Sequence, residues 1–115
     1  MDPKRAKELV LQERRRIEGS LRGLAAADVG ELPHQDEHLE HLADDATDLV
    51  QDELDEAVAE QLRRELEAVE RAEQRLAEGT YGLSVESGEP IPDERLEANP
   101  TAERTAEEQE RFERA

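Results

Sequence analysis

The stretch EGTYGLSVESGEPIPDERLEANPTAERTAEE, residues Glu78–Glu108, decides how the chain is interpreted. Glycines and prolines recur in it every few residues, and few of its side chains are large enough to build a hydrophobic core. This pattern predicts a compact series of turns that leads into a helix. Small units of this kind commonly depend on a zinc ion held by four cysteines, but the chain contains no cysteine.

The residues before this stretch predict two amphipathic helices. The first spans about residues 3–27, with Asp2 as its N-cap, and the second spans about residues 37–78 and ends at Gly79. Apolar residues follow each other at steps of three, four and seven, which places them on one face of each helix. In the first helix these residues are Ala6, Val10, Ile17, Leu21 and Leu24. In the second they are Leu42, Ala46, Leu49, Val50, Leu54, Val58, Leu62, Leu66, Val69 and Leu76.

The segment DVGELP, residues 28–33, separates the two helices with a glycine and a proline. Two apolar stripes joined by a short polar loop favour an antiparallel hairpin. The fold class is therefore all-α: a helical hairpin (coiled coil) with a small turn-rich base and a C-terminal helix. We expect the hairpin to span residues 1–78, with its tip around 28–48, and the base with its C-terminal helix to span 79–115.

The C-terminal helix is predicted to begin near Pro100, with Thr101 as its cap. Ala102, Ala106 and Phe112 would then face inward. The base would be held by a small hydrophobic core. Its expected members are Tyr81, Leu83, Val85, Ile91, Leu96 and Phe112.

Composition excludes several functions. The chain has 115 residues and a formal net charge of −17, and phosphate groups would repel such a protein, so direct binding of nucleic acid is not expected. No apolar run approaches the roughly 20 residues that a membrane span needs, which makes the cytoplasm the expected location. Carboxylates are too frequent to mark a catalytic pair, so we do not expect an enzyme.

The turn-rich stretch resembles the C-terminal zinc-finger region of the DksA/TraR family of transcription factors. The matching positions occur without a gap and are Gly79, Tyr81, Gly82, Gly88, Ile91, Arg95, Leu96, Ala98, Pro100 and Ala102. A second, weaker match is HLADDATD, residues 41–48, which resembles the motif at the hairpin tip of some members.

The resemblance implies a function. In the family, the hairpin tip enters the secondary channel of RNA polymerase and modulates initiation without contacting DNA. By resemblance, Asp44 would be the acidic tip residue, Ala46 would keep the tip narrow, and His41 and Asp48 would be further tip residues. RNA polymerase would then be the protein partner of a monomer.

The chain departs from the family at the metal site. The four positions of the zinc cysteines are occupied by Ser84, Ser87, Thr105 and Glu108. Neutral hydroxyl groups are weak zinc ligands, so we expect no metal and no other cofactor. Instead, the hydroxyls of Ser84, Ser87 and Thr105 are expected to hydrogen-bond nearby backbone and keep the turns.

Three alternatives stay open at this point. The chain could be a divergent helical interaction or stress protein that has lost polymerase binding, since all four zinc ligands are missing. His34, His38 and His41 could bind a metal near the tip, or be solvent-exposed. The basic residues of the first helix, including Arg14–Arg16, could match the acidic second helix or contact an acidic rim of the polymerase.

Overall fold

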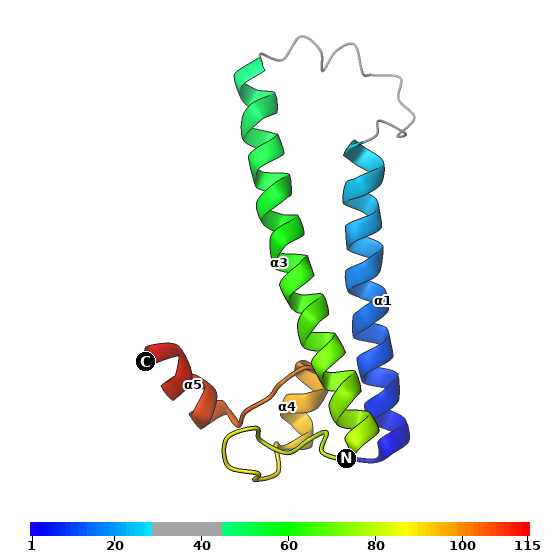
Figure 1. The fold of residues 1–115 in the computed structure, drawn as a ribbon, viewed down its shortest axis with the longest axis vertical. Helices are drawn as coiled ribbons and strands as arrows, with labels where there is room; N and C mark the ends of the chain where they lie inside the picture. The colour runs from blue at the N-terminus through cyan, green and yellow to red at the C-terminus, as the bar shows by residue number, and fades with distance from the viewer. Residues whose placement is uncertain (29–44) are drawn as a thin grey trace. The chain divides into compact units, whose positions relative to one another are not determined.

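The computed structural model describes residues 1–28 and 45–115, with side chains described for 1–25 and 52–115. Its elements are α1 (Pro3–Asp28), α3 (Asp45–Glu78), α4 (Asp93–Ala98) and α5 (Ala106–Arg114) (Figure 1). Within these ranges there is no strand, and the isolated antiparallel bridge between Leu83 and Pro90 is the nearest approach to one. The predicted all-α helical hairpin with a turn-rich base is confirmed. No helix in the described ranges is both long and apolar enough to cross a membrane.

The first helix begins where the sequence predicts. Asp2 caps it, since the backbone N–H of Arg5 donates to the Asp2 carboxylate at 3.3 Å and Pro3 occupies the first helical position. Ala6, Val10 and Ile17 are buried, as expected from their spacing, and Leu9 is buried as well. The opposite side of α1 is exposed.

The second long helix, α3, ends where the sequence predicts. The backbone N–H groups of Gly79 and Thr80 donate to the carbonyls of Leu76 and Arg75, a Schellman arrangement that needs a left-handed residue at Gly79, whose φ is 80°. Leu62 and Val69 of the predicted stripe are buried, and Ala72 joins them. Leu54 and Val58 of the same stripe are about half exposed, so the stripe is covered only in part.

Two compact units make up the chain. One contains residues 1–15 and 67–115, namely the start of α1, the end of α3 and the whole base; the other contains residues 16–66. In each unit, ion pairs join α1 to α3: Arg14 to Glu73 at 2.8 Å in the first and Arg16 to Glu65 at 2.8 Å in the second. The boundary expected between 1–78 and 79–115 stays a prediction.

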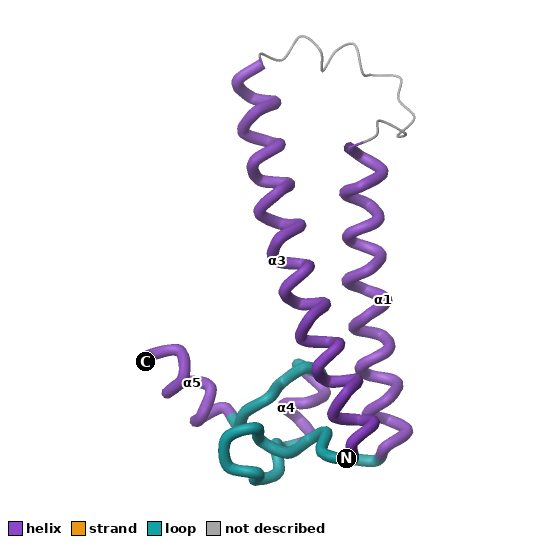
Figure 2. Tube along the Cα trace, viewed as in Figure 1, coloured by secondary structure: helices purple, strands orange, loops and turns teal. Residues whose placement is uncertain are grey.

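The base has a small hydrophobic core of Ile91, Leu96 and Ala102, with Tyr81 packed against it. Loops carry the chain from α3 to α4 and from α4 to α5 (Figure 2). The Tyr81 hydroxyl donates to the carbonyl of buried Pro100 at 2.7 Å, which closes the loop after α4. Burial raises the pKa of the Tyr81 phenol, so it remains a donor at neutral pH.

Tyr81→Phe is expected to lower the free energy of unfolding by about 1–3 kcal/mol, because the Pro100 carbonyl loses its donor inside the base. Urea unfolding followed by far-ultraviolet circular dichroism measures the loss. Leu83→Ala, at an exposed position of the same turn, is the control and should have a smaller effect. Equal midpoints for Tyr81→Phe and the unchanged protein would contradict this role of the hydroxyl.

The sequence prediction was wrong about part of the base. Leu83, Val85 and Phe112 are exposed rather than in the core, and α4 was not predicted as a helix. Leu83 and Val85 flank Ser84, which is buried in this turn while both of its apolar neighbours are exposed. Thr105, not Thr101, caps α5, and the shift turns Phe112 outward, where the Arg104 guanidinium lies 3.9 Å from its ring centre.

Candidate functional site

The positions that the resemblance assigns to zinc ligands are joined by hydrogen bonds. Ser84 lies in the turn after α3 and is buried, and its hydroxyl donates to Oε1 of Glu108 at 2.6 Å. The same hydroxyl oxygen accepts from the backbone N–H groups of Glu86 at 3.1 Å and Ser87 at 3.3 Å. One serine side chain therefore fixes the turn that contains it and ties that turn to the start of α5.

Glu108 reaches this position because it is the third residue of α5. The backbone N–H of Thr105 donates to Glu108 Oε1 at 2.9 Å, and the backbone N–H of Glu108 donates to the Thr105 hydroxyl at 3.3 Å. These two bonds form a capping box, which satisfies backbone donors at the helix start. The Glu108 carboxylate thus completes the cap and holds Ser84 at the same time.

These contacts stabilise the charged form of Glu108. The hydrogen bond from Ser84, with further ones from Ser87 and the Thr105 backbone, lowers the pKa of the carboxyl to about 2. The side chain is buried, and every one of these donors favours the ionised carboxylate. At neutral pH the group is an anion that accepts hydrogen bonds from the Ser84 hydroxyl and the Thr105 backbone N–H.

This set of residues does not fit a zinc ion. Zinc prefers thiolate and imidazole ligands, whereas the four side chains are two serines, a threonine and one glutamate. The Ser84 hydroxyl already donates to the carboxylate and accepts two backbone N–H groups, so its hydrogen-bonding capacity is used within the protein. In the described part of the chain, no three histidine, aspartate or glutamate side chains are grouped as a metal site would require.

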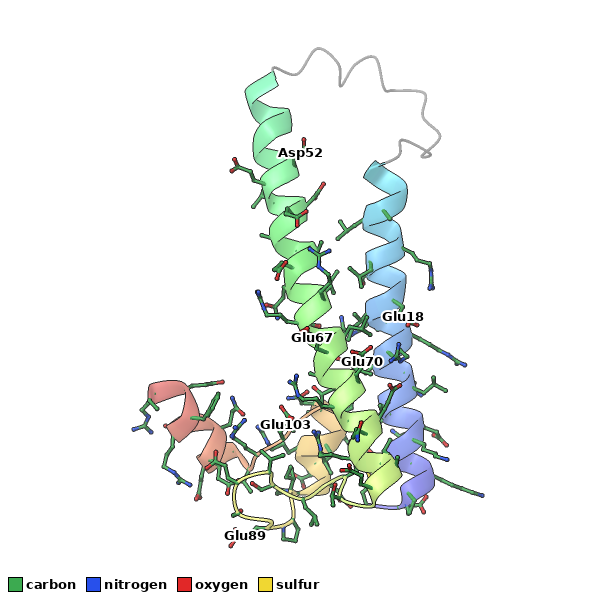
Figure 3. All side chains as sticks on the ribbon, in the orientation of Figure 1. Glu18, Asp52, Glu67, Glu70, Glu89 and Glu103 are labelled. Carbon is green, nitrogen blue, oxygen red and sulfur yellow. The ribbon has the colours of Figure 1, made fainter. Side chains whose placement is uncertain are left out.

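A second polar cluster ties the base to α3. Oε2 of Glu103 accepts from Nε of Arg71 at 3.1 Å and from Nη1 of Arg75 at 3.0 Å, and Figure 3 shows Glu103 beside this end of α3. The Glu103 carbonyl also accepts from the backbone N–H of Val85 at 2.9 Å. Arg75 is buried, so this carboxylate compensates a charge that is removed from water.

The start of α1 also contacts the base. Arg5 forms two parallel hydrogen bonds with the Glu97 carboxylate, Nε to Oε2 at 2.9 Å and Nη2 to Oε1 at 2.7 Å. The N-terminal ammonium lies 3.4 Å from Asp93. Charged contacts therefore join the base to the start of α1 and to the end of α3.

The expected tip residues lie where the structure gives no side-chain geometry. Asp44 and His41, with His34 and His38, fall outside the described residues. Ala46 and Asp48 belong to the first turn of α3, but their side chains are not described. Their roles at the tip stay predictions.

The role of Glu108 was missed from the sequence, although a signal was present. Thr105 and Glu108 have the spacing Thr-x-x-Glu that typifies a capping box. Thr101, which was predicted as the cap, has Arg104 at the corresponding position and lacks this signal. The contact with Ser84, 24 residues away, has no such local signature.

Comparisons with known proteins match the same region. Residues 79–114 match the family model of the prokaryotic dksA/traR C4-type zinc finger. The chain is 37% identical over 86 residues to the RNA polymerase-binding transcription factor DksA of Caulobacter vibrioides. The aligned residues make up 75% of this chain and 61% of that protein. The structure of transcription factor DksA2 from Pseudomonas aeruginosa superposes with a TM-score of 0.76 and 28% identity, over 97% of this chain and 83% of the other.

The C-terminal region of the chain, residues 79–114, belongs to the DksA/TraR zinc-finger family. It is a variant that lacks all four zinc cysteines, since the whole sequence contains none. General stress protein 16O of Bacillus subtilis is another relative, 43% identical over 83 residues, or 71% of this chain and 49% of that protein. The matches thus span about half to three fifths of the length of these curated relatives.

Proposed function

We propose that the chain is a transcription regulator that binds RNA polymerase, inserts its hairpin tip into the secondary channel and modulates initiation without binding DNA directly. The observation that carries the proposal is the similarity to DksA2 over 97% of the chain. The identity to a DksA that is named as RNA polymerase-binding supports the choice of partner. Asp44 is the residue proposed to act at the tip, with His41, Ala46 and Asp48 beside it.

A slender helical pair suits this role because it can carry a carboxylate to a depth that a globular protein cannot reach. The net charge of −17 supports a protein partner rather than DNA. Binding energy at the tip would then bias the polymerase between states of the initiation complex. We propose that the protein acts as a monomer.

A second function is favoured by the relationship to General stress protein 16O. In this alternative, the chain is a helical interaction or stress protein that has kept the scaffold and lost polymerase binding. The absence of the zinc cysteines is compatible with both functions, because the base has its own hydrogen-bonded contacts.

Asp44→Asn is expected to leave polymerase binding intact and to reduce the effect on initiation by about tenfold or more, the loss typical of a charged hydrogen bond. Binding is measured by pull-down of the cognate core polymerase at low and moderate salt, and the effect by abortive initiation. Asp52→Asn, at an exposed position of α3, makes the same change of charge and should behave like the unchanged protein (Figure 3).

Two results would contradict parts of this proposal. If the unchanged protein does not bind polymerase even at low salt, the polymerase function fails and the alternative replaces it. If Asp44→Asn and Asp52→Asn lose activity equally, net charge rather than the tip residue controls the effect, and the role of Asp44 is wrong.

A further inference from the structure

Arginines on α1 that turn toward the rest of the protein are paired with glutamates. Arg5, Arg14 and Arg16 each lie within 2.8 Å of a carboxylate oxygen. Their partners are Glu97, Glu73 and Glu65, respectively. The structure thus answers part of the question raised by the basic first helix, because charge matching within the chain accounts for these three residues.

Four other cations on α1 are not matched in this way, namely Lys4, Lys7, Arg15 and Arg22, and the first three lie within one compact unit. Lys4, Lys7 and Arg15 are exposed, and none of them forms an ion pair or a side-chain hydrogen bond with any residue that the structure describes. Lys4 and Lys7 are three residues apart, and Lys7 and Arg15 are eight residues apart. Leu11 lies midway between Lys7 and Arg15, four residues from each. These spacings place these three cations and Leu11 on one side of the helix, which we call the basic face.

The basic face is notable in a chain of net charge −17, because it holds both of the lysines in the sequence. Two acids adjoin it, Glu8 and Glu18; the Glu8 carboxylate accepts from Arg5 at 3.3 Å, and Glu18 also has an interaction of its own. At physiological salt, charges more than about 8 Å away are largely screened. A partner that approaches the basic face therefore experiences mainly its local positive charge.

An apolar groove borders this face. It has a volume of about 470 Å³ and runs between α1 and α3 within one compact unit. Its lining residues are Lys7, Val10, Leu11, Glu73, Leu76 and Ala77. The single acid among them, Glu73, is already paired with Arg14, and Leu11 is 44% exposed beside Lys7. An apolar side chain could enter the groove while acidic groups meet the cations at its edge.

We propose that the basic face and this groove form a docking surface for an acidic amphipathic helix of a partner protein. The four residues of the face span about 16 Å along α1, which equals about three turns of a helix. Glutamates at spacings of three and four on the partner would oppose the lysines and Arg15, and a leucine among them would occupy the groove. The proposal does not depend on polymerase being the partner.

Nucleic acid and a second copy of this chain are less suitable partners for this surface. Three cations are few for a phosphate backbone, and the remainder of the chain repels it. An exposed leucine at the centre of the face adds nothing to phosphate binding. A second copy would bring another −17 charge close, which disfavours self-association at the same site.

The test uses a fluorescein-labelled, end-capped model helix of glutamate, leucine and alanine, with glutamate and leucine spaced three and four apart. Anisotropy titrations at low and high salt compare the full-length protein with the triple variant Lys4→Gln, Lys7→Gln, Arg15→Gln. We expect the unchanged protein to bind the peptide at low salt and the triple variant to lose about tenfold or more in affinity. Leu11→Ser should weaken binding without changing its salt dependence.

The matched control is Arg64→Gln, Arg111→Gln, Arg114→Gln, which removes the same charge from exposed positions outside α1 and should bind as the unchanged protein does. A peptide with glutamine in place of glutamate should not bind. Circular dichroism checks that each variant is folded.

The proposal is overturned by any of four results. The acidic peptide does not bind at low salt; the triple variant binds it unchanged; duplex DNA competes for the same three cations at least as well; or sedimentation shows self-association that the triple variant abolishes. Because polymerase is absent from this experiment, its failure is distinct from failure of the proposed function.

Discussion

Glu103→Ala is expected to lower the free energy of unfolding by about 3–5 kcal/mol, the loss that follows when a buried ion pair is left with one partner. The charge left behind is Arg75, which is 8% exposed. Two of its guanidinium nitrogens, Nε and Nη2, are buried without a hydrogen-bond partner among the described residues. Glu103 is the carboxylate that compensates this cation, at 3.0 Å from Nη1.

Two further variants test whether the loss of stability comes from the uncompensated charge of Arg75 or from a general loss of surface charge. Glu86→Ala removes a carboxylate that pairs with Arg104 at 2.6 Å in a more exposed setting, where such pairs contribute about 0–1 kcal/mol. The double variant Glu103→Ala, Arg75→Met removes the buried charge together with its partner, so it should recover most of the lost stability. Urea unfolding of all four proteins provides the comparison.

A loss for Glu103→Ala that is no larger than that for Glu86→Ala would contradict the explanation. So would a double variant that is less stable than Glu103→Ala alone, because Arg75 would then contribute through its packing rather than through an uncompensated charge. In either case the contact between the base and α3 would rest on its apolar core.

The hairpin could be predicted from the sequence because its signals are local. The spacing of Ala6, Val10 and Ile17 identifies the buried side of α1, and Asp2 and Gly79 mark where helices begin and end. Each of these features depends on residues within about two turns of a helix. No knowledge of distant contacts was needed.

The base could be predicted only in outline. Ile91 and Leu96 were recognised as core residues, but Phe112 was placed inside because α5 was started too early. The true start depends on Glu108, whose carboxylate also meets Ser84 from a separate turn. A hydrogen bond between residues 24 positions apart, such as the one from Ser84 to Glu108, leaves no periodic pattern in the sequence. Only the capping box of Thr105 and Glu108 could have been predicted from the sequence.

The candidate site, like the base, was predicted from the sequence only in part. The four former cysteine positions were located from the resemblance, and their hydroxyls hold nearby backbone, as expected for Ser84, Ser87 and Thr105. The joint arrangement around one carboxylate was not expected, because Glu108 was considered only as one member of a poor set of zinc ligands. Asp44 and its neighbours were named from a motif, and their role depends on the polymerase experiment.

Acid titration of Glu108→Gln should show how the base is held without metal. The ionised Glu108 accepts hydrogen bonds that a glutamine side chain reproduces only in part and without charge, so the variant should melt several degrees lower at neutral pH. The folded pKa of about 2 lies below the ordinary value of 4.5, so the stabilisation is fully present above about pH 4.5. It is lost progressively as the pH falls from about 4.5 to about 2.

The expected result is therefore a difference in melting temperature between the two proteins that is constant near neutrality and closes in acid. Glu73 and Glu97, whose pKa values are also lowered by arginine partners, titrate in both proteins, so the difference isolates Glu108. Glu107→Gln, an exposed neighbour in the same helical turn, is the control and should follow the unchanged protein at every pH. A chelator should leave all three melting curves unchanged, because the side chains around Ser84 are not zinc ligands. If the difference in melting temperature persists undiminished to pH 2, Glu108 acts through its shape alone. If a chelator changes the melting temperature, a metal does bind.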